Sequence, residues 1–110
     1  MRLRFVEKCV QDVPEQPGVF TLWDHNHPVY IGRTAPRSDL RSELAHALTM
    51  AMAEDMCATH FSFEVTNAPK TRAAEELRDH FARWGALPRY NESPRTAPDE
   101  SAVLRPGGTP

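Results

Sequence analysis

The chain has 110 residues, 40% of them hydrophobic and 25% charged, a balance that is ordinary for one globular domain. The formal net charge of −2 excludes binding of nucleic acid through overall charge, so a polyanion site would need a local basic patch. The sequence contains no apolar run long enough for a membrane span or a signal peptide. Cys9 and Cys57 lack metal or redox spacing, so we expect reduced thiols in a cytoplasmic protein.

The first thirteen residues leave two structures open. Phe5, Cys9 and Val13 recur every four residues, which predicts a short helix, and a strand over residues 2–6 is the alternative. Two strands follow, over 18–24 and 29–32, because both runs are rich in β-branched and aromatic residues. The polar residues 24–28 between them are typical of a turn, which makes this pair a hairpin.

The next segment predicts a helix, a strand and a second helix. Ser38 is the expected cap of the first helix, whose apolar residues recur every four positions. Residues 60–65 alternate as a strand does, and Pro69 and Gly85 are the expected start and end of the second helix. The predicted buried positions of the two helices are Leu40, Leu44, Leu48 and Met52, then Ala73, Ala74, Leu77, Phe81 and Trp84.

The last segments contain little that could form a core. Residues 87–91 are predicted to be extended, and residues 93–110 are rich in proline and glycine, so they are predicted to be a flexible tail. We therefore expect one domain over residues 1–92. Its predicted class is α+β, with a three-stranded antiparallel sheet flanked by helices.

Two short motifs in the hairpin suggest a family. The first is Gly18-Val19-Phe20, and the second, after a gap of nine residues, is Tyr30-Ile31-Gly32 followed by Arg33. With the order of the later helices and the closing segment Pro88-Arg89-Tyr90-Asn91, the chain resembles the GIY-YIG endonuclease superfamily over roughly residues 17–92.

This resemblance implies metal-dependent hydrolysis of DNA phosphodiester bonds. A glutamate of the second helix, either Glu75 or Glu76, would hold Mg²⁺ or Mn²⁺, which polarises the scissile phosphate. A phenol would orient or deprotonate the attacking water, and a guanidinium would offset charge on the phosphate. The implied catalytic residues are Tyr30, Arg33, Arg41, His46 and Asn91.

The sequence departs from the family pattern in three ways. Phe20 replaces a tyrosine, Glu43 stands where the helix arginine is expected, and neither Glu75 nor Glu76 has the usual spacing to buried aliphatic residues. Arg41 lies two residues before Glu43, about 200° away around the helix. The alternatives are therefore an eroded domain that binds nucleic acid or a protein partner without cleavage, and an unrelated three-stranded domain.

Overall fold

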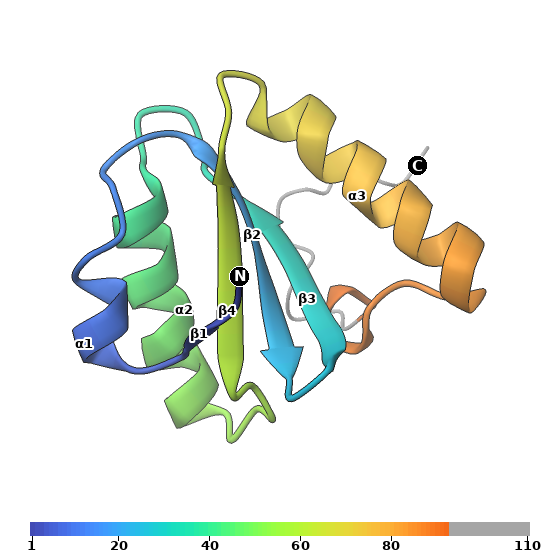
Figure 1. Ribbon diagram of the computed structural model, residues 1–110, viewed down its shortest axis with the longest axis horizontal. Coiled ribbons are helices and arrows are strands. Elements are labelled where there is room, and N and C mark those ends of the chain that lie inside the picture. Colours follow the sequence, from blue (N-terminus) through green and yellow to red (C-terminus); the bar gives the residue numbers. More distant parts are fainter. Residues whose placement is uncertain (93–110) are drawn as a thin grey trace.

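Four antiparallel strands form one sheet between two layers of helices. The computed structural model describes residues 1–92, and the predicted tail lies outside them. The sheet has the order β1 (Leu3–Arg4), β4 (His60–Val65), β2 (Gly18–Asp24), β3 (His27–Arg33). Helices α1 (Glu7–Val10) and α2 (Leu40–Ala53) cover one face, and α3 (Pro69–Trp84) covers the other (Figure 1). A 3₁₀ turn, η1 (Arg89–Asn91), packs on β3.

The predicted α+β class is confirmed, but the predicted count of three strands is wrong. Leu3 and Arg4 pair with Phe61 and His60 and add a fourth strand, β1, at the edge of the sheet. The predicted N-terminal helix is reduced to α1, so the strand that was the alternative and the helix are both present in part. A strand of two residues is too short to show an alternation of apolar and polar residues, so only its pairing with β4 defines it.

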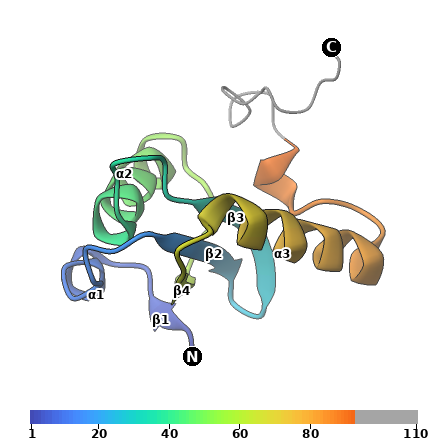
Figure 2. The same cartoon turned by 90° about the horizontal axis from the view of Figure 1, so that it is seen from above.

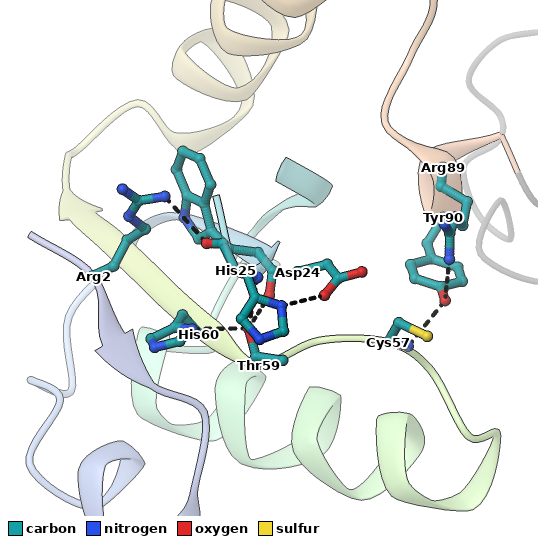
Figure 3. Close-up of polar contacts among 9 residues, drawn as sticks. Arg2, Asp24, His25, Cys57, Thr59, His60, Arg89 and Tyr90 are labelled. Carbon is teal, nitrogen blue, oxygen red and sulfur yellow. Dashed lines mark hydrogen bonds and ion pairs between the residues drawn. The ribbon is translucent and has the colours of Figure 1, made fainter. Parts of the chain in front are cut away.

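The turn of the hairpin is shorter than the sequence suggests, and β3 begins at His27 rather than at Val29. The left-handed conformation of His25, with φ of 58°, lets the chain reverse over two residues. The backbone N–H of His25 donates to Thr59 Oγ1 at 2.7 Å, and Arg2 donates to the His25 carbonyl at 3.2 Å (Figure 3). The N-terminus and the segment before β4 therefore hold this turn in place.

The hydrophobic core lies between the sheet and α2. Alternate residues of a strand point to opposite faces, and the register places Phe20 and Leu22 of β2 on the α2 side, together with Phe61. Their neighbours Thr21 and Trp23 point toward α3. The buried residues of this core are Phe5, Val10, Val13, Phe20, Leu22, Val29, Leu40, Leu44, Ala51 and Phe61.

Helix α2 turns its predicted apolar stripe gradually away from the core, with Leu48 partly buried against it. Leu40 and Leu44 are fully buried, whereas Met52 is 77% exposed. Residues four apart drift by about 40° per step around a helix, so a stripe spaced by four rotates away from the sheet over three steps. Ala51, seven residues after Leu44, returns to the buried face. The cap is Asp39 rather than Ser38, because the Asp39 carboxylate accepts from the Ser42 N–H at 2.9 Å.

Helix α3 has the predicted ends and a different buried face. It begins at Pro69, and Gly85 ends it in the left-handed conformation with φ of 77°. Ala73 is buried as predicted, but Phe81 and Trp84 are 55% and 52% exposed. The helix lies across β2 and β3 at one side of the sheet (Figures 1 and 2). The Trp84 ring meets His27 at the start of β3, with centroids 5.1 Å apart, so it is only half covered. No helix within residues 1–92 is both long and apolar enough to cross a membrane.

Candidate functional site

Tyr30 lies in a cavity between the sheet and α2. Its β3 position pairs with Leu22, so its ring points to the α2 side, where it packs beside Phe20 with ring centroids 6.1 Å apart. A Cβ at Gly32 would meet both rings, so this glycine provides their space. The cavity has a volume of about 200 Å³, and it is lined by Phe20, Leu22, Tyr30, Glu43, His46, Ala47, Met50, Glu54 and Met56.

An acid rather than an arginine faces Tyr30 from α2. Glu43 lines the cavity, and its Oε2 accepts a hydrogen bond from the backbone N–H of Ala35 at 3.1 Å. Arg41 lies on another side of the helix, where its Nε donates to the Val13 carbonyl at 2.8 Å and its guanidinium pairs with Glu15 at 3.4 Å. The two-residue offset seen in the sequence therefore separates Arg41 from Tyr30.

Only one of the other implied catalytic residues lines the cavity with Tyr30. His46 does so, from the turn of α2 that follows Glu43. Arg33 is exposed at the end of β3, where its guanidinium lies 3.5 Å from the Thr34 carbonyl as a long hydrogen bond. The structure thus places Tyr30 and His46 together, and Arg33 and Arg41 outside the lining of their cavity.

Asn91 holds the closing segment against β3. Its Oδ1 accepts from the backbone N–H of Ile31 at 2.8 Å, and its Nδ2 donates to the Ile31 carbonyl at 2.9 Å. The segment that the sequence predicts to be extended forms η1 instead, and the Tyr90 hydroxyl accepts from the Cys57 N–H at 3.0 Å (Figure 3). Asn91 therefore contacts β3 at Ile31, the residue that follows Tyr30, and both polar atoms of its side-chain amide bond to the backbone there.

Glu75 and Glu76 belong to the opposite face of the sheet. Glu76 lines an open groove of about 610 Å³ with Thr21 and Ile31. Because neighbouring residues of a strand point to opposite faces, Ile31 and Tyr30 are separated by the sheet itself. The two carboxylates implied as metal ligands and the phenol implied to act with them are therefore not on one face.

Arg72 forms ion pairs with both of these carboxylates. It lies 3.1 Å from Glu64, 3.1 Å from Glu75 and 2.8 Å from Glu76. The hydrogen bonds that it donates to Glu64 and Glu75, together with the charge of Glu76, raise the pKa of Arg72 above its ordinary value. The spacing of three and four residues from Arg72 to the two glutamates was the sequence signal for this cluster.

Replacing Arg72 tests how strongly this cluster is held. We expect Arg72→Gln to lower the melting temperature, because three neighbouring carboxylates then repel one another. The loss should shrink as salt rises from about 0.01 M to about 1 M, because the Debye length falls from about 30 Å to about 3 Å. Arg78→Gln, at an exposed position of the same helix, is the control. Equal, salt-independent shifts for the two variants would contradict the electrostatic explanation.

The described part of the chain has no ready metal centre. Within residues 1–92, no three His, Cys, Asp or Glu side chains lie close enough together to hold an ion. Models of known families, curated proteins and solved structures give no match to this chain.

Two residues reach the Tyr30 cavity from beyond the end of α2. Glu54 is the C-terminal cap of α2, and Met56 follows in the loop before β4. No motif or spacing in the sequence marks either residue, because the direction of a loop after a helix is set by packing.

Proposed function

We propose that this chain is a domain of GIY-YIG-like fold that binds a protein partner and does not hydrolyse phosphodiester bonds. The observation that supports this most is the placement of the two implied halves of the site. Tyr30 lies on the α2 side of the sheet, whereas Glu75 and Glu76 lie on the α3 side. A metal bound at either glutamate could not act on a phosphate held at Tyr30, because a four-stranded sheet stands between them.

The charges around Tyr30 also argue against a phosphate. Glu43 and Glu54 both line its cavity, and the described residues that line it include no lysine or arginine. A phosphate there would meet like charges and no guanidinium to offset its own. Phosphoryl chemistry requires a positive charge at the position of the helix arginine. Glu43 places a negative charge there, which repels a phosphate.

The resemblance in fold rests on the hairpin and the order of elements. A helix, a strand, a second helix and a closing segment that ends in Asn91 follow Tyr30-Ile31-Gly32 in the order that the family has. The free thiols of Cys9 and Cys57 suit a reducing compartment, so we place the protein in the cytoplasm. The Mg²⁺-dependent nuclease implied by the resemblance is the competing function, and Tyr30 and His46 in one cavity are its support.

A plasmid-nicking assay separates the two functions. Supercoiled DNA is incubated with Mg²⁺ or Mn²⁺ and with the wild type, Tyr30→Phe or Glu76→Ala, over a wide range of protein concentration. We expect no nicking above the protein-free level for any of the three, because the phenol and the carboxylates lie on opposite faces. Metal-dependent nicking by the wild type that both substitutions abolish would overturn the proposal.

The same preparations test the choice of partner. We expect no retardation of duplex or single-stranded DNA at low salt, because the chain has a net negative charge and an acidic cavity. Binding without nicking that weakens steeply with salt would make nucleic acid the partner and would overturn the assignment to protein.

A further inference from the structure

We infer that the Tyr30 cavity is a recognition pocket for an arginine side chain of the partner, an inference that rests on the proposed function. The cavity is about 200 Å³, below the roughly 300–1,000 Å³ of sites for drug-sized molecules. A space of this size suits one side chain. Its chemistry then decides which side chain enters.

The charge of the lining selects a cation. Glu43 and Glu54 contribute two carboxylates, and His46 is the only basic group among the described residues that line the cavity. The three come from α2 and its C-terminal cap, and the sheet opposite them supplies Phe20, Leu22 and Tyr30. Acidic and phosphorylated groups are disfavoured here, and lysine and arginine are favoured.

The apolar part of the lining suits the stem of a long cationic residue. Leu22, Ala47, Met50 and Met56 provide aliphatic and thioether surface. The methylene groups of an arginine can pack on such surface while its charged end meets the carboxylates. Methionine side chains adapt their shape, so they accommodate a guest without a rigid fit.

Two features favour a guanidinium over an ammonium. A guanidinium is planar and stacks on an aromatic ring, and the rings of Tyr30 and Phe20 lie side by side in the lining. It also pairs with carboxylates through several N–H groups in a fixed geometry. Glu43 is oriented for this role, because the Ala35 N–H binds its Oε2 and limits the rotation of the carboxylate.

A titration with blocked amino acids tests the inference directly. N-acetyl-arginine-N-methylamide has no other charge, and the matching citrulline compound has the same length without the cation. Backbone amide shifts of the ¹⁵N-labelled full chain are the readout. We expect saturable shifts in α2 and β3 with a Kd of about 1 mM for the arginine compound, and binding about tenfold weaker for citrulline. The lysine compound should fall between them.

Charge-neutral variants locate the site. Glu43→Gln keeps an oxygen that accepts from Ala35 and removes the charge, so we expect it to weaken arginine binding about tenfold. Glu54→Gln should weaken it as well, and it serves as the second variant if Glu43→Gln does not fold. Glu75→Gln removes the same charge from α3, which covers the opposite face of the sheet, and should leave the affinity unchanged.

The outcomes distinguish this inference from the proposed function. Equal binding of arginine and citrulline, or equal loss with Glu75→Gln and Glu43→Gln, would overturn the arginine pocket and leave the absence of nicking untouched. Metal-dependent nicking would overturn the proposed function whatever the titration gives. Shifts confined to α3, or saturation by the blocked glutamate compound, would also contradict the pocket.

Discussion

Phe61→Ala is expected to destabilise the domain by about 3–5 kcal/mol, the range measured for buried aromatic residues truncated to alanine. Phe61 is fully buried near the start of β4 and pairs with Leu3 on one side and Leu22 on the other. Its ring meets Phe5 edge-on at 5.8 Å and stacks with Phe63 at 6.4 Å. Removing it therefore opens a cavity where three strands and the N-terminal segment meet.

Urea unfolding followed by circular dichroism measures this loss. The free energy of unfolding of a domain is only about 5–15 kcal/mol, so the unfolding midpoint of the variant should move to a much lower urea concentration. Phe81→Ala is the matched control, because it deletes the same ring at a position that is 55% exposed. We expect it to change stability by about 0.5 kcal/mol at most. Similar losses for the two variants would contradict the placement of the core.

Asn91→Ala is expected to cost about 2–3 kcal/mol, because it leaves both backbone groups of Ile31 without their side-chain partner. The amide of Asn91 mimics the pairing of an additional strand on the free edge of β3. Its loss should release η1 from the sheet and expose the strand on which Tyr30 lies. We thus expect Asn91→Ala to lower the stability of the fold, whereas substitution of a residue that acted only in catalysis would leave stability unchanged.

The measurement compares urea midpoints and amide hydrogen exchange at Ile31. We expect the Ile31 N–H to exchange faster in Asn91→Ala, because its acceptor is gone. Asn67→Ala, at an exposed position before α3, is the control and should change neither quantity. An unchanged midpoint together with unchanged exchange at Ile31 would show that Asn91 does not hold the closing segment.

Much of the local structure followed from the sequence because its causes are local. The alternation of residues 60–65 predicted β4 with its observed bounds, and Pro69 and Gly85 marked both ends of α3. A proline in the first turn and a glycine in the left-handed conformation act through their own backbone angles, so no distant contact is needed to read them. The mismatch at Glu43 was likewise visible in the sequence, because helical spacing decides which residues share a face.

The tertiary structure decided the candidate site. Whether Glu76 and Tyr30 share a face depends on which side of the sheet each helix packs, and no spacing within either segment carries that information. Tertiary contacts also decide the pairing of Leu3 in β1, the position of Glu54 in the same cavity as Tyr30 and the exposure of Trp84. The sequence by itself determined the bounds of β4 and α3, because caps and periodicity act over a few residues, whereas the start of β3 at His27 follows from its pairing with Asp24. Packing across the sheet determined which side chains meet, because those contacts join residues far apart in the chain.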